Sequence, residues 1–194
     1  ATTVNDISSP FDLVVNPSET TVYEITALSD ALCNSIAADI AGTATVTVHP
    51  RPTSTISGTT TICNGDITPV TIVLTGAAPW NISYEVNGAN VDVNNILNSP
   101  YVIDADPSIS TTYVVTSVVD ANGCSANGTD MTGSAVITVN DRPTGTLTGG
   151  ETICAGSTAD LTFSLTGTQP YTIYYTENGV GQSVTGVNLD TYVL

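Results

Sequence analysis

Cysteine is the residue type whose spacing in this chain most clearly indicates a chemical role. Cys33 and Cys124 are 91 residues apart, as are Cys63 and Cys154. A zinc site is not favoured, because the chain has no C-x-x-C pair and only one histidine. Cysteines that recur at two fixed places are typical of disulfides, which form in an oxidising, extracellular setting.

We therefore expect a disulfide between Cys63 and Cys124, which fall within one 91-residue stretch. Cys33 and Cys154 would then pair with cysteines outside the chain segment. The alternative is that all four cysteines are buried free thiols. The two interpretations differ in whether the fold depends on an oxidising environment.

Carboxylate and amide side chains in expected loops form a second candidate group. Their oxygen atoms are ligands that calcium prefers, so a calcium site is one interpretation. However, the run Asp-Ala-Asn-Gly is also a good hairpin turn without any metal. We favour turns, expect no cofactor, and keep calcium as the weaker alternative. The weak calcium candidates are Asp104, Asp106, Asp120, Asn122 and Asp130.

Catalytic chemistry is not indicated by the remaining residues. The one histidine, His49, is replaced by Asn140 one period later, so a general base would be lost between copies. The acidic pair Asp104 and Asp106 likewise has no acidic counterpart in the first repeat. The sequence also has no Gly-rich phosphate-binding loop. We therefore predict that the chain is not an enzyme.

The 91-residue spacing also relates whole sequence segments. Arg51-Pro52-Thr53 returns as Arg142-Pro143-Thr144, and Trp80 returns as Tyr171. A fixed period of this length indicates an array of small domains. We predict that residues 50–141 form one complete repeat. Residues 1–49 would be the C-terminal half of the preceding repeat, and residues 142–194 the N-terminal half of the next.

Half a sandwich exposes its inner face and open strand edges, so it should not be stable alone. Either the chain is a window cut from a longer array, or halves from different molecules complete each other. We favour the first interpretation. If two halves were joined, segments near both ends of the chain would correspond to the same strand of one repeat.

Apolar and polar residues alternate over short runs, which predicts strands rather than helices. Trp80, Ile82 and Tyr84 share one face, and aromatic residues recur at Tyr171 and Tyr175. This recurrence favours an inward core face over an exposed sugar-binding platform. About seven short strands separated by tight turns predict an all-β fold of tandem antiparallel Ig-like sandwiches, each of about 91 residues.

Arg51 with Pro52, and Arg142 with Pro143, mark the expected junctions between repeats. Proline stiffens a linker because its ring fixes φ. Each arginine could bind the adjoining repeat through its planar guanidinium and set the angle between domains. The alternative is a solvated linker charge of little energetic value.

Charge and hydropathy exclude several partners. Two arginines face eighteen acidic residues, giving a formal net charge of −16. This charge repels nucleic acid and anionic membrane surfaces. No apolar run approaches the ~20 residues that span a bilayer, so we expect no membrane insertion.

Several phrases together resemble the tandem Ig-like or PKD-like repeats of giant Bacteroidota cell-surface adhesins. They are Thr-Thr-Thr-Ile-Cys-Asn-Gly, Ser-Pro-Tyr, Thr-Thr-Tyr-Val-Val-Thr-Ser-Val-Val-Asp-Ala-Asn-Gly-Cys and Ala-Val-Ile-Thr-Val-Asn-Asp-Arg-Pro-Thr. The resemblance covers essentially the whole chain. Members of that group are typically exported by the type IX secretion system, and some act in gliding motility.

The resemblance implies a structural repeat of an extracellular adhesin or filament at the cell surface, forming a stiff rod. Its partners would be neighbouring repeats, other copies in a fibre or bundle, and surface polysaccharide or partner cells. Two alternatives are a carbohydrate- or cell-binding module and spacer repeats of a secreted multidomain enzyme.

Overall fold

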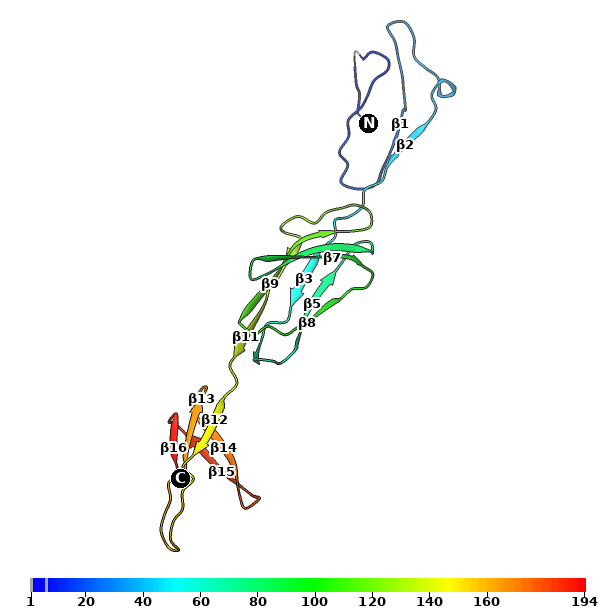
Figure 1. Cartoon of the computed structure of the whole chain (residues 1–194). Coiled ribbons are helices and arrows are strands. Elements are labelled where there is room, and N and C mark those ends of the chain that lie inside the picture. The colour runs from blue at the N-terminus through cyan, green and yellow to red at the C-terminus, as the bar shows by residue number, and fades with distance from the viewer. Residues whose placement is uncertain (1, 6) are drawn as a thin grey trace.

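A computed structural model describes residues 2–5 and 7–194 of the chain. The fold is all-β and elongated, with three regions arranged in a row (Figure 1). We call them the N-terminal segment (residues 2–5 and 7–49), the central unit (residues 50–141) and the C-terminal unit (residues 142–194). The all-β class predicted from alternation is confirmed. Among the described residues, no helix is both long enough and apolar enough to cross a membrane.

The central unit contains two packed sheets. One sheet has the strand order β10-β3-β5-β8 and the other has the order β4-β11-β9-β6-β7. Apolar residues from both sheets, such as Ile72 of β5 and Ile82 of β6, meet in one buried core. The strands are β3 (Ser54–Ser57), β4 (Thr60–Cys63), β5 (Thr68–Leu74), β6 (Trp80–Val86), β7 (Ala89–Ile96), β8 (Tyr101–Ala105), β9 (Thr111–Val119), β10 (Met131–Thr132) and β11 (Ala135–Asn140).

Strand formation in the central unit follows the alternation of its residues. In β5, Val70, Ile72 and Leu74 are buried, whereas Val73 is 46 % exposed. The β6–β7 hairpin turns at Asn87 and Gly88, which both have positive φ, as a tight two-residue turn requires. Burial on one face and a tight turn therefore explain why this stretch forms antiparallel strands.

The C-terminal unit repeats only part of this arrangement. Its strands are β12 (Thr144–Thr148), β13 (Thr162–Thr166), β14 (Tyr171–Glu177), β15 (Val180–Val187) and β16 (Thr191–Val193). They form the sheets β12-β13-β16 and β14-β15. These strands correspond, 91 residues later, to β3, β5, β6, β7 and β8. In the part of the chain that the structure describes, no strand of this unit corresponds to β4, β9, β10 or β11.

The N-terminal segment contains counterparts of two strands, β9 and β11, that the described C-terminal unit lacks. Strands β1 (Thr21–Glu24) and β2 (Thr43–Val46) form an antiparallel pair, and the short 3-10 helix η1 (Ala37–Asp39) lies in the connection. Tyr23 of β1 pairs with Ala44 of β2, just as Tyr113 of β9 pairs with Ala135 of β11. The register therefore aligns β1 with β9 at a spacing of 90 residues and β2 with β11 at 91.

Candidate functional site

The two ends of the central unit, where the chain enters and leaves, hold most of the residues that the sequence singled out. At the entry end, the guanidinium of Arg51 donates a hydrogen bond to the carbonyl oxygen of Ser125 at 3.0 Å. The Sγ of Cys124 donates to the carbonyl oxygen of His49 at 3.9 Å. The entry linker is thus held by the loop between β9 and β10.

At the exit end, Arg142 binds back to the unit that the chain has just left. Its Nε donates to the carbonyl oxygen of Asn64 at 2.7 Å, and its Nη2 forms an ion pair with Asp66 at 2.5 Å. The side chains of Arg142 and Asp66 are 56 % and 47 % exposed, so solvent screens the pair and its contribution to stability is small.

The two arginines therefore differ. Arg142 has the partner on the adjoining unit that sequence reasoning expected, whereas Arg51 binds within its own unit. Sequence reasoning missed Asn64 and Asp66 as partners. The position 91 residues after Asp66 is Ser157, so the acidic residue does not recur at the equivalent position of the next repeat.

The predicted disulfide between Cys63 and Cys124 is not formed, and this expectation is corrected. Both residues are free cysteines, as are Cys33 and Cys154. Cys63 ends β4 opposite Asn140, beside the exit linker, whereas Cys124 contacts His49 of the entry linker. Because the two linkers leave the central unit at opposite ends, the two sulfur atoms do not meet (Figure 1). The alternative of four buried thiols is also wrong for Cys33 and Cys154, which are exposed.

Asp120, one of the weak calcium candidates, organises a loop at the entry end. Its Oδ1 accepts hydrogen bonds from the N–H groups of Asn122 and Cys124, and its Oδ2 accepts one from Ala77. Burial raises the pKa of Asp120, but the hydrogen bonds from Ala77, Cys124 and Asn122 together outweigh it and lower the pKa. Asp30 accepts the same type of bonds from Leu32 and Cys33 in the N-terminal segment.

The other calcium candidates lie apart from this loop. Asp104 projects from the exposed side of β8, and Asp106 follows that strand. Asp130 accepts a hydrogen bond from the N–H of Asn127 and so closes a separate turn. Among the residues that the structure describes, no group of three or more histidine, cysteine or acidic residues could hold a metal ion. Of these candidates, Asp120 and Asp130 thus hold turns, whereas Asp104 is an exposed strand residue.

The aromatic residues Trp80 and Tyr84 point into the core. They are 6 % and 7 % exposed, and burial raises the pKa of Tyr84, with smaller contributions from Tyr101 and Tyr113. The indole N–H of Trp80 donates to the carbonyl oxygen of Thr75 at 2.9 Å. These two side chains therefore do not form a surface for stacking a sugar.

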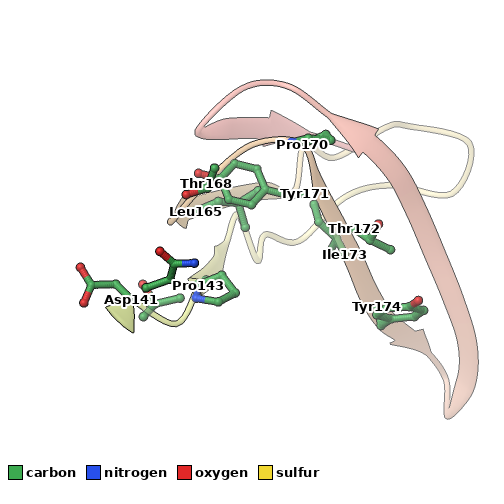
Figure 2. A pocket seen from close by; sticks show the side chains of 12 residues that line it. Asp141, Pro143, Leu165, Thr168, Pro170, Tyr171, Thr172, Ile173 and Tyr174 are labelled. Carbon is green, nitrogen blue, oxygen red and sulfur yellow. The ribbon is translucent and has the colours of Figure 1, made fainter. Parts of the chain in front are cut away.

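A pocket lies on the C-terminal unit, between β12–β13 and β14. Figure 2 shows Leu165, Tyr171 and Ile173 at this opening, with Pro143 of the linker beside them. The hydroxyl of Tyr171 donates to Asp190 at 2.9 Å and holds the end of β14 against the turn before β16. Hydrogen bonds from Gln169 and Tyr171 lower the pKa of Asp190. Tyr171 and Ile173 are buried at this opening, and Leu165 is partly buried, whereas Leu74, 91 residues before Leu165, is 4 % exposed.

No protein-family model matches the chain, and no curated protein matches it either. The function of this chain is therefore inferred from its geometry and from its repeat.

Proposed function

We propose that this chain is a non-catalytic structural repeat of an extracellular adhesin or filament, in which Ig-like sandwiches of about 91 residues form a stiff rod at the cell surface. In this role the useful properties are length and rigidity. The neighbouring units of the same protein are its main partners, and the acidic surface keeps the rod soluble.

The observation that carries this proposal is the end-to-end arrangement of the three regions. The chain enters the central unit at one end and leaves at the other, so each added unit lengthens the molecule (Figure 1). A fold with both termini at one end would instead give a cluster of units. The recurrence of the same residues after 91 positions supports further units of this kind.

Rigidity is supported by the short linkers. Pro52 is buried in the central unit, and Pro143 lies against Gly167, where an added Cβ would be 3.1 Å from the proline. The contacts of Arg142 with Asn64 and Asp66 add a second attachment across the exit linker. A linker held on both sides bends less than a free tether.

The carbohydrate-binding alternative would need a row of exposed aromatic residues. Tyr174 is 81 % exposed on β14, but the residue 91 positions earlier is Ser83. An aromatic platform therefore does not recur between units, which favours the mechanical role.

Electron microscopy of the native protein on its producing cells tests the proposal. We expect thin filaments at the cell surface with an axial repeat of roughly 35–45 Å, the length of a sandwich whose strands have about eight residues. A protein found only inside cells, or a compact particle without an axial repeat, would contradict the proposal.

A further inference from the structure

Cys63 and Cys124 lie at the two ends of the central unit, where it meets its neighbours. Cys63, the exit cysteine, ends β4 beside the exit linker. Cys124, the entry cysteine, lies in the loop that holds the entry linker. Both residues are partly buried. Ile62 packs against the core, so alternation along β4 directs the side chain of the exit cysteine away from the core. Each cysteine is therefore placed at a junction between units.

One backbone carbonyl group relates the two cysteines to each other. At the exit, the carbonyl oxygen of Asn140 accepts a hydrogen bond at 2.8 Å from the N–H of Asn64, the residue after the exit cysteine. At the entry, the equivalent oxygen belongs to His49, 91 residues earlier, and lies 3.9 Å from the Sγ of the entry cysteine. The carbonyl group at this position thus contacts the peptide group after the exit cysteine of its own unit and the sulfur atom of the following unit's entry cysteine.

The arginine of the junction gives the same relation through a different set of contacts. Arg142 reaches back to the preceding unit, where its Nε donates to the carbonyl oxygen of Asn64 at 2.7 Å. Arg51, 91 residues earlier, reaches forward, and its Nη1 donates to the carbonyl oxygen of Ser125 at 3.0 Å. Asn64 and Ser125 are the residues directly after the exit and entry cysteines. Because the two contacts use different nitrogen atoms, one guanidinium has donors for both.

We propose that a disulfide crosses each junction between consecutive units and joins the exit cysteine of one unit to the entry cysteine of the following unit. Cys63 then pairs with the cysteine that takes the place of Cys124 in the next repeat. Cys124 pairs with the cysteine that takes the place of Cys63 in the preceding repeat. By the same rule, Cys33 pairs toward the preceding repeat and Cys154 toward the following one, so no two of the four pair with each other. The inference rests on the proposed function, since it needs further repeats of this kind on either side.

The separation of the two cysteines at one junction suits such a bond. A disulfide joins residues whose Cα atoms are about 4.4–6.8 Å apart. The exit cysteine pairs with Asn140 in the parallel pair of β4 and β11, and neighbouring strands lie about 4.8 Å apart. The sulfur atom of the entry cysteine contacts the equivalent carbonyl oxygen, that of His49. Within one unit, by contrast, the two cysteines lie at opposite ends of the sandwich (Figure 1).

The bond adds a second covalent connection beside each linker. A single linker lets two units pivot about it, whereas a cross-link next to the linker removes part of that freedom. The ion pair of Arg142 with Asp66 is exposed and too weak to have this effect alone. The disulfides are therefore a source of stiffness in the rod.

The covalent step requires an oxidant. Each pair of thiols loses two protons and two electrons as the sulfur–sulfur bond forms. The acceptor is a small-molecule disulfide such as oxidised glutathione, which is reduced to two thiols by exchange through a mixed disulfide. Such oxidants act in the extracellular setting of the proposed rod.

Disulfide mapping of the native protein tests the inference. The full-length protein is taken from its producing cells, its free thiols are blocked with iodoacetamide, and it is digested with pepsin in acid, where exchange through thiolates is suppressed. Because the residues around the four cysteines differ, mass spectrometry assigns each peptide to its repeat. We expect each of the four to be joined to a cysteine outside residues 1–194, with the partner of Cys63 in the next repeat. A bond between any two of the four, or free thiols throughout, would overturn the inference.

A pair of variants of the full-length protein identifies the partner of Cys63. Cys63→Ser removes the exit cysteine, so we expect one cysteine of the following repeat to become reactive toward a maleimide while Cys124 stays blocked. A bridge within the central unit would instead release Cys124, and that result would contradict the inference. Thr61→Ser is the matched control, since Thr61 is exposed two residues earlier on β4 and its replacement should release no thiol.

The inference and the proposed rod can fail separately. Filaments with the expected axial repeat but with free thiols would overturn the disulfide and leave the rod. The same bonds in a protein that forms no filaments would overturn the rod and leave the disulfide.

Discussion

At the scale of single residues, Asp120 and Asp30 hold equivalent loops by accepting backbone hydrogen bonds. Asp120 gathers three backbone N–H groups from two loops, and Asp30 repeats two of these contacts in the N-terminal segment. A carboxylate has enough acceptor sites for all three donors, which an apolar side chain would leave unpaired.

The lowered pKa of Asp120 predicts a pH dependence of stability. A carboxylate with a lowered folded pKa stabilises the fold fully above its ordinary pKa of about 4, and this contribution is lost as the pH falls through the lower folded value. Asp120→Asn turns an amide donor toward the N–H of Ala77. We expect the variant to be less stable than the parent chain at neutral pH.

Urea denaturation at a series of pH values measures the difference. The two proteins should converge in stability as the medium becomes strongly acidic, because Asp120 is then protonated in the parent chain. Asp106→Asn, at an exposed position outside the loop, serves as the control. A difference between Asp120→Asn and the parent that stays constant over the acid range would contradict this account.

At the scale of secondary-structure elements, pairing between distant segments decides which strands form. β4 forms in the central unit because β11 lies beside it in parallel register. The corresponding residues 151–154 form no strand in the C-terminal unit, where the described chain has no counterpart of β11. Similar sequence therefore has different structure because the hydrogen-bonding partner is missing.

Gly133, between β10 and β11, lies close to the backbone of Ile56 in β3. Its φ is +83°, and a Cβ there would lie 2.3 Å from the carbonyl oxygen of Ile56. We expect Gly133→Ala to lower the free energy of unfolding by about 1–3 kcal/mol, because both the φ and the contact are unfavourable. Gly128→Ala is the matched control, since its Cβ would meet nothing within 4 Å. Urea denaturation in which both variants lose the same stability would contradict the prediction.

At the scale of the whole molecule, the junctions determine shape. Arg142→Ala removes the contacts with Asn64 and Asp66 that cross the exit linker. We expect a stability loss of only about 0.2–1 kcal/mol, because the pair is exposed. The angles between the central and C-terminal units should nevertheless spread more widely in electron micrographs.

Arg51→Ala is the control for this effect. Arg51 binds Ser125 within the central unit, so its loss should leave the angles at the exit junction unchanged. If Arg142→Ala gave the same distribution of angles as the parent chain, the arginine would have no part in setting the direction of the rod.

The sequence alone determined the all-β class, with short strands separated by tight turns, and the core face of β6 that carries Trp80, Ile82 and Tyr84. These features depend on alternation and turn chemistry, which are local properties of the chain. The candidate sites were harder to predict. The repeat identified an arginine at each junction. It did not identify Asp66 as the partner of Arg142, because Asp66 does not recur.

Only the tertiary structure decided where the cysteines lie. Their spacing in sequence suggested a bridge within one unit, yet Cys63 and Cys124 are at opposite ends of the same sandwich. The reason is physical. Spacing along a chain records how often a residue recurs, whereas a bond between two sulfur atoms depends on strand direction and on which end of the sheet each strand reaches.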